Sequence, residues 1–249
     1  MPETKNLYGL IGYPLTHSFS KKYFTEKFEE MGISSEHRYE LFEMEDAAEF
    51  TELFEKYPNL RGINITIPHK QSVFQFLDEL DHSASNVGAV NVVKREGTKL
   101  IGYNSDFYGF QRSLIEFMGS VPQGLKALVL GNGGAAKAVV AALEDLSVQV
   151  QLVSRKASDI AIDYDQAKSA IEDHLLIVNC TPLGTYPKTD ASPDLAYEKL
   201  TSEHYLFDLV YNPAETQFMK KGIEQNANVK NGYDMLVYQA EKSWEIWQS

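Results

Sequence analysis

A glycine-rich turn in the second half of the chain restricts the possible folds more than any other part of the sequence. It follows an apolar, strand-like run at 127–130 and precedes an Ala-rich, helix-like run at 135–146, and another strand-like run covers 148–153. Glycines between a strand and a helix let the backbone turn tightly and approach a pyrophosphate at the helix N-terminus. The pattern predicts a βαβ unit that binds a dinucleotide, with a glycine turn that carries no ligand as the alternative. The residues expected to contact the cofactor here are Gly131, Asn132, Gly133, Gly134 and Ala135.

The turn after the second of these strands indicates which dinucleotide is bound. An NAD-binding domain usually has an acidic residue at this strand end, about 20 residues beyond the glycines, which accepts a hydrogen bond from the ribose. This chain has Ser154, Arg155 and Lys156 instead. A hydroxyl, a guanidinium and an ammonium are all suited to a 2'-phosphate. We therefore expect NADP rather than NAD, with a solvated basic turn as the alternative.

A second informative stretch, at 62–70, combines a strand-like pattern with polar groups near its end. Three isoleucines alternate with Asn64 and Thr66, and Pro68 is expected to end the strand. Lys70 follows just beyond, where a rigid scaffold commonly places groups that contact a ligand. The alternative interpretation is an ordinary edge strand with a solvated polar face.

Strand-like and helix-like segments alternate along the whole chain, which predicts an α/β fold. Beyond the segments described above, strands are expected at 8–12, 38–42, 89–94, 99–103, 175–179 and 205–209. Helices are expected at about 21–31, 46–56, 72–79, 105–118 and 234–247. The strands at 89–94 and 99–103 should form a hairpin, because a glycine lies in the short polar turn between them. A second α/β domain is expected to begin near Gly124.

Composition excludes several partners and kinds of site. The 249-residue chain has a formal net charge of −12, whereas nucleic acids and anionic membranes are bound by clustered cations. No apolar run approaches the ~20 residues needed to span a bilayer, and no signal peptide is visible. Cys180 is the only cysteine and the six histidines show no ligand-like spacing, so neither a disulfide nor a metal site is expected. We expect a cytoplasmic monomer or homodimer whose partner is a small-molecule substrate.

Five further polar segments, taken in their order along the chain, carry a resemblance to a known family. They lie at 12–20 (GYPLTHSFS), 88–91 (GAVN), 102–106 (GYNSD), 208–213 (DLVYNP) and 232–240 (GYDMLVYQA). Each segment alone could be a turn or a helix cap. Together they resemble the shikimate dehydrogenases, and the resemblance covers essentially the whole chain.

The resemblance implies a particular division of the fold and a particular reaction. An N-terminal α/β domain would bind the substrate, a Rossmann-type domain would bind NADP, and the C-terminal helix would return to the first domain. The expected boundaries are 1–105 plus 233–249 for the substrate domain and 106–232 for the NADP domain, with the active site in the cleft. Members of the family reduce 3-dehydroshikimate reversibly to shikimate with NADPH, on the route to chorismate and the aromatic amino acids.

The resemblance also assigns roles to individual residues. Lys70 and Asp106 match the paired catalytic residues. The residues that match groups holding the substrate carboxylate are Ser18, Ser20 and Tyr211. Those that match contacts with the ring hydroxyls are Thr66, Asn91 and Gln239. Cofactor contacts are implied at Gly131, Asn132, Gly133, Gly134, Ala135, Ser154, Arg155, Lys156, Leu209 and Gly232.

Several positions depart from the family pattern. Lys21 stands where proline is usual, Asn132 where a small residue is usual, and Thr185 where methionine is common. Asp234 precedes Met235 where a small residue often appears, and the segment between Arg155 and Asn179 is short. These differences concern the fit of the cofactor more than the reaction.

Two other functions stay open at this point. A quinate/shikimate dehydrogenase would use a broader range of substrates or cofactors, and the basic turn at 154–156 speaks only against NAD. A non-catalytic NADP-binding sensor is expected to have lost the lysine and the aspartate of the reaction, whereas Lys70 and Asp106 are both present.

Overall fold

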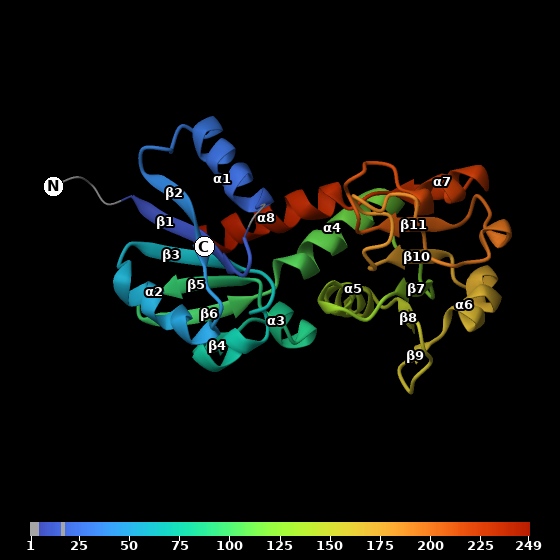
Figure 1. Cartoon of the computed structure of the whole chain (residues 1–249), viewed down its shortest axis with the longest axis horizontal. Coiled ribbons are helices and arrows are strands. Elements are labelled where there is room, and N and C mark those ends of the chain that lie inside the picture. The colour runs from blue at the N-terminus through green and yellow to red at the C-terminus, as the bar shows by residue number, and fades with distance from the viewer. Residues whose placement is uncertain (1–4, 16–17) are drawn as a thin grey trace. The chain divides into compact units, whose positions relative to one another are not determined.

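The computed structural model describes residues 5–15 and 18–249 (Figure 1). Contacts divide the chain into two compact units. The first unit comprises the described part of Met1–Ser105 together with Ala240–Ser249, and the second comprises Asp106–Gln239. Helices α4 (Ser105–Met118) and α8 (Tyr233–Gln248) each begin in one unit and end in the other. The C-terminal helix therefore returns to the first unit as predicted, while the domain boundaries given above stay predictions.

The first unit is built on a six-stranded sheet with the order β2-β1-β3-β5-β6-β4. Its strands are β1 (Asn6–Gly12), β2 (His37–Glu43), β3 (Leu60–Ile65), β4 (Glu79–Leu80), β5 (Val92–Glu96) and β6 (Lys99–Tyr103). β1 is parallel to β2 and β3, and β5 is antiparallel to β3 and forms the predicted hairpin with β6. The helices are α1 (Phe19–Glu30), α2 (Phe50–Lys56) and α3 (His82–Val87), with 3-10 turns η1 (Ala47–Glu49) and η2 (Ser72–Phe76).

Two apolar clusters cover the two faces of this sheet. Leu7 and Ile11 of β1 belong to the cluster that contains α2, whereas Tyr8 belongs to the cluster that contains α1 and α8. Successive residues of a strand point to opposite faces, so the clusters lie on opposite sides. The second cluster is strongly aromatic, with the ring centroids of Tyr8 and Trp247 only 4.9 Å apart. This packing holds the last turns of α8 on the first unit.

Strand β3, which ends near the polar groups, differs from the prediction in the residue at which it stops and in its position within the sheet. β3 stops at Ile65, before Pro68, and Ile67 is 73% exposed although the alternation predicted a buried side chain. The chain instead turns, with Thr66 N donating to Ile11 O at 2.9 Å. β3 also lies between β1 and β5, so the edge-strand alternative is wrong.

Close packing of Trp247 requires a glycine at position 62. A Cβ at Gly62 would lie 2.1 Å from Trp247 Nε1, which itself donates to Val93 O at 3.0 Å. We expect Gly62→Ala to destabilise the fold by about 1–3 kcal/mol, because overpacking of a filled core costs about this much. Thermal unfolding measures the loss. When Trp247 is replaced by the smaller phenylalanine, the added Gly62→Ala change should destabilise the fold less than it does beside tryptophan. An unchanged melting temperature of Gly62→Ala would refute the explanation.

The second unit is built on a six-stranded parallel sheet with the order β12-β11-β10-β7-β8-β9. Its strands are β7 (Lys126–Leu130), β8 (Gln149–Val153), β9 (Ala161–Ile162), β10 (Leu176–Asn179), β11 (Tyr205–Asp208) and β12 (Asn228–Lys230). Its further helices are α5 (Gly134–Asp145), α6 (Tyr164–Ala170) and α7 (Gln217–Glu224), with 3-10 turns η3 (Ile171–Asp173) and η4 (Tyr197–Lys199). The strand order reverses between β7 and β10, and ligands of open α/β sheets bind beyond the carboxyl ends of the strands at such a point.

The predicted α/β class with two sheets is confirmed, but several elements were not predicted. The segment at 72–79 forms η2 followed by β4 rather than one helix. Helices α3, α6 and α7 and strands β9 and β12 were missed. A signal for α6 was present, because Asp163 and Gln166 form a capping box, a pattern that marks helix starts.

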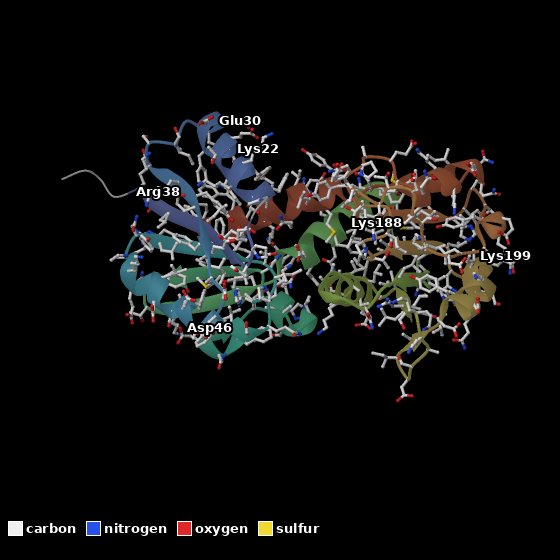
Figure 2. All side chains as sticks on the ribbon, viewed as in Figure 1. Lys22, Glu30, Arg38, Asp46, Lys188 and Lys199 are labelled. Carbon is white, nitrogen blue, oxygen red and sulfur yellow. The ribbon has the colours of Figure 1, made fainter. Side chains whose placement is uncertain are left out.

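Exposed charged side chains include Lys22 and Glu30 on α1 in the first unit and Lys188 in the second unit (Figure 2). In the described part of the chain, none of the helices has the length and apolar character that crossing a membrane requires.

Candidate active site

Two serines at the start of α1 provide the first polar groups of the candidate site. Ser18 is the N-cap of α1, and its hydroxyl accepts a hydrogen bond from Lys21 N at 3.2 Å. Ser20 lies in the first turn of α1 and hydrogen-bonds the side chain of Tyr39. Thr16 and His17, which belong to the polar segment at 12–20, lie outside the described residues.

A chain of hydrogen bonds connects Ser20 of α1 to β3 and α8. Tyr39 Oη donates to Asn64 Oδ1 at 2.8 Å, and Asn64 Nδ2 donates to Ser243 Oγ at 3.0 Å. Burial raises the pKa of Tyr39 well above its usual range, and the hydrogen bond with Ser20 opposes this shift. Neither Tyr39 nor Ser243 was expected from the sequence, because the contacts that join them to Asn64 span distant parts of the chain.

Lys70 and Asn91 are tied to the same end of the first sheet. Val90 N donates to Lys70 O at 2.8 Å, and Ser105 N donates to Asn91 Oδ1 at 2.7 Å. Asp106 directly follows Ser105 in the first turn of α4, where the helix dipole favours a carboxylate. The structure therefore brings Lys70, Asn91 and the N-terminus of α4 to the point where β3 stops and β5 begins.

The turn after β3 places Thr66 close to the end of β1. A Cβ at Gly12 would lie 2.4 Å from Thr66 Cγ2, so a side chain at position 12 would displace Thr66. His69, in the same turn, is buried, and its Nε2 lies 2.8 Å from Met44 O. Thr66 is thus positioned by β1, whereas His69 is part of the packing below the turn.

In the second unit, the predicted glycine turn lies between β7 and α5. Gly131 has a φ of +102°, a conformation that glycine adopts without strain. Gly133 is the N-cap of α5 and supplies no side-chain cap, and a Cβ at Gly133 or Gly134 would meet nothing within 4 Å. The N-terminus of α5 therefore has no side-chain cap and has open space beside Gly133 and Gly134, as an anion site at a helix N-terminus requires.

Two hollows, with volumes of about 550 Å³ and about 580 Å³, adjoin the glycine turn. Ser154 and Arg155 line both hollows, and Lys156 lines the first of them. Neither Arg155 nor Lys156 forms an ion pair with any of the described residues. Ser154 Oγ donates to Lys156 O at 2.5 Å, which ties the turn together. The residues at the entrance fit a phosphorylated ribose, because two cations remain available there.

A third hollow, of about 420 Å³, lies over the ends of β10 and β11. Ala135, Leu209 and Tyr211 line it, three residues that the sequence analysis had named. A Cβ at Gly232 would lie 2.2 Å from Leu209 O, so only glycine allows this approach of two backbones. The other lining residues were not expected from the sequence as contacts, and they are Cys180, Thr181, Pro182, Thr185, Tyr186, Val210 and Asn212.

The substrate residues named from the sequence do not all fall in one unit. Ser18, Ser20, Thr66, Lys70 and Asn91 belong to the first unit. Asp106, Tyr211 and Gln239 belong to the second unit, in which Gln239 Nε2 donates to Leu236 O at 2.9 Å. Among residues 5–15 and 18–249, no cluster of three or more histidine, cysteine or acidic side chains could hold a metal ion.

The chain is similar over almost its whole length to proteins of known family. The family model described as "Shikimate dehydrogenase substrate binding domain" matches residues 10–93. A protein of Clostridium beijerinckii named "Shikimate dehydrogenase (NADP(+))" is 42% identical, with 97% of this chain and 91% of that protein covered.

Solved structures agree with this similarity. The Listeria monocytogenes shikimate 5-dehydrogenase, solved with shikimate and NAD, gives a TM-score of 0.89 at 28% identity over 98% of this chain and 92% of that one. The Corynebacterium glutamicum quinate dehydrogenase, solved with NAD, gives a TM-score of 0.88 at 26% identity over 98% and 93% of the two chains. From the full-length identity to the Clostridium protein, we conclude that this chain belongs to the shikimate dehydrogenase family.

Proposed function

We propose that this protein catalyses the reversible, NADPH-dependent reduction of 3-dehydroshikimate to shikimate, a step of chorismate and aromatic amino acid biosynthesis. The observation that carries the proposal is the 42% identity, over 97% of the chain, to a relative named for this activity. The protein is an NADP-dependent oxidoreductase that acts on a CH–OH group of a small molecule. A cytoplasmic location and a monomeric or homodimeric state stay predictions.

The second unit offers suitable groups for each end of the cofactor. The open N–H groups of α5 after Gly133 would hold the pyrophosphate, and Arg155 and Lys156 would hold the 2'-phosphate. Leu209 and Gly232, which approach each other closely beside the third hollow, would border the nicotinamide end. Bound NADPH supplies the hydride that reduces the ring ketone.

Reduction of a ketone also requires a proton donor at the carbonyl oxygen, and Lys70 is the proposed donor. A nearby carboxylate attracts the ammonium, and at an effective dielectric of about 20 a pair of unit charges about 4 Å apart gains about 4 kcal/mol. Asp106 would supply that charge, hold the ammonium and share the substrate hydroxyl. Lys70 would then act as acid in reduction and as base in oxidation.

The remaining polar groups would fix the orientation of the substrate. Ser18, Ser20 and Tyr211 would bind the carboxylate through neutral hydroxyls. Thr66, Asn91 and Gln239 would contact the ring hydroxyls. Two hydrogen bonds support these roles, because they hold a polar group in place by its oxygen and leave its N–H or O–H to the substrate. Ser18 Oγ accepts from Lys21 N, and Asn91 Oδ1 accepts from Ser105 N.

Loss of a serine hydroxyl should weaken substrate binding more than it slows turnover. Hydrogen bonds to a charged group contribute about 1.5–3 kcal/mol, so Ser20→Ala should raise KM for shikimate by about 10- to 100-fold. The kcat should fall less, because the carboxylate lies away from the reacting carbon. Steady-state kinetics of Ser18→Ala and Ser20→Ala test this, with the exposed Ser34→Ala as the control. A lower kcat at unchanged KM would contradict the assignment.

A spectrophotometric assay of cofactor reduction tests the proposed function. Shikimate with NADP should give rapid reduction, and the same substrate with NAD should be slow. No turnover of shikimate with either cofactor would overturn the proposal, and it is the result expected of a non-catalytic sensor.

Quinate is a second candidate substrate, favoured by the similarity to the Corynebacterium glutamicum quinate dehydrogenase. Testing quinate in the same assay distinguishes an enzyme specific for shikimate from one that also uses quinate. Turnover of quinate at a rate equal to that of shikimate would support the broader quinate/shikimate activity.

A further inference from the structure

A buried carboxylate–amide pair lies beneath the loops that line the third hollow. Asn179 and Asp208 are the last residues of β10 and β11 and stand opposite each other in the parallel register. Both side chains are 0% exposed, although both are polar. Asn179 Nδ2 donates to Asp208 Oδ1 at 2.9 Å. The ends of two neighbouring strands are therefore joined by their side chains as well as by the sheet.

The pair also binds the second residue of each following loop, and we define these loops as the β10 loop (180–186) and the β11 loop (209–213). Asn179 Oδ1 accepts from Thr181 N at 3.0 Å and from Thr181 Oγ1 at 2.6 Å. Asp208 Oδ1 accepts from Val210 N at 3.0 Å. These contacts fix the backbone where each loop leaves its strand.

Both loops form walls of the hollows assigned to the cofactor. Thr181 lines the third hollow and the larger of the two hollows beside the glycine turn, and Val210 lines the third. Thr181 also packs against the glycine turn, because a Cβ at Gly131 would lie 3.2 Å from Thr181 Cγ2. A shift of the β10 loop would therefore change the cofactor site directly.

Asp208 forms its third bond with the residue that caps the next helix. Its Oδ2 accepts from Thr216 Oγ1 at 2.6 Å, and Thr216 is the N-cap of α7. All three partners of the carboxylate are donors, which matches an ionised carboxylate that accepts hydrogen bonds only. Burial raises the pKa of Asp208 above its usual value, and these three hydrogen bonds oppose the rise.

We propose that Asp208 and Asn179 are positioning residues that hold the β10 and β11 loops in the form that binds the dinucleotide. The inference rests on the proposed function, since it assigns the cofactor to these hollows. Neither side chain would touch the cofactor, because both are completely buried. Their role would be exerted through Thr181 and Val210.

The test replaces Asp208 with its isosteric amide and measures cofactor binding apart from turnover. In Asp208→Asn, one acceptor oxygen becomes an NH2 group and the negative charge is lost, so the hydrogen bonds from Asn179 Nδ2 and Val210 N are weakened and hold the loops less firmly. We expect Kd for NADPH, measured by fluorescence of the reduced nicotinamide, to rise at least about tenfold. The kcat at saturating cofactor should change much less, since the reacting groups are untouched. Should Asp208→Asn fail to fold, Asn179→Ala takes its place with the same expected results.

A swapped pair and a stability control separate positioning from simple support of the fold. Asn179→Asp/Asp208→Asn again joins an amide to a carboxylate, so it should bind NADPH at least about threefold more tightly than Asp208→Asn. Thr216→Val removes the bond to Oδ2 of the same carboxylate and the cap of α7, and keeps a side chain of the same shape beside Gly184. It should lower the melting temperature and leave Kd for NADPH unchanged.

Three results would overturn the inference. They are an unchanged Kd in Asp208→Asn, a swapped pair that binds no better than the single variant, and a Kd that rises equally in Thr216→Val. The wild-type protein in the same assay tests the proposed function separately. If the wild-type protein binds no NADPH and turns over no shikimate, the proposed function has failed. If it binds NADPH and turns over shikimate, the results with the variants test only the positioning roles.

Discussion

Replacing Lys70 with alanine should lower kcat for shikimate oxidation by about 100-fold to 10,000-fold, the usual loss when an acid–base group is removed. The oxidation requires a group that accepts the hydroxyl proton, and alanine offers none. Binding of NADP should change little, because the cofactor residues proposed above all lie in the second unit. Stopped-flow measurement of the reduced cofactor, with saturating substrate, gives the rate directly.

A matched lysine in the same unit provides the control for this variant. Lys99 is exposed and pairs with Glu79 at the surface, so Lys99→Ala removes the same charge away from the site. It should keep the wild-type rate. Near-normal turnover by a folded Lys70→Ala protein would mean that another group transfers the proton.

Removing both cations of the basic turn should abolish the preference for NADP. Each charge-assisted contact to a phosphate contributes about 1.5–3 kcal/mol, so Arg155→Ala/Lys156→Ala should raise Kd for NADPH by about 100-fold or more. Binding of NADH should stay near its original level, since NADH lacks the 2'-phosphate. Titrations with both reduced cofactors, followed by their fluorescence, measure the change.

The control for the basic turn removes two lysines from elsewhere in the second unit. Lys188 (labelled in Figure 2) and Lys220 are exposed, so Lys188→Ala/Lys220→Ala alters the net charge equally. This variant should keep its preference for NADPH. If the two double variants weaken NADPH binding to the same extent, the effect comes from overall charge and not from the turn.

Local patterns in the sequence predicted most of the fold. The glycine turn at Gly131 and its flanking segments appear in the structure as β7, α5 and β8, because the strand, turn and helix signals all agree there. The prediction failed where a local pattern was misleading. Ile67 continued an alternation that the turn after Ile65 ends. Short elements such as β9 and β12 have two and three residues, too few for a periodic pattern.

Local patterns in the sequence also predicted part of the candidate site. Arg155 and Lys156 were found because they follow a strand directly, and the structure places them at the hollows beside the glycine turn. The Asn179–Asp208 pair was not found, because it joins residues 29 positions apart. Tyr39 and Asn64 likewise meet only when β1, β2 and β3 assemble into a sheet. Such contacts depend on tertiary structure and leave no local signal.

The most direct test of the mechanism is a crystal structure of the protein with shikimate and NADP bound together. The account predicts that Lys70 Nζ and a carboxylate oxygen of Asp106 each lie about 2.6–3.2 Å from the same hydroxyl of shikimate, beside the nicotinamide. A complex in which either side chain points away from the substrate, or in which shikimate binds apart from the nicotinamide, would contradict it.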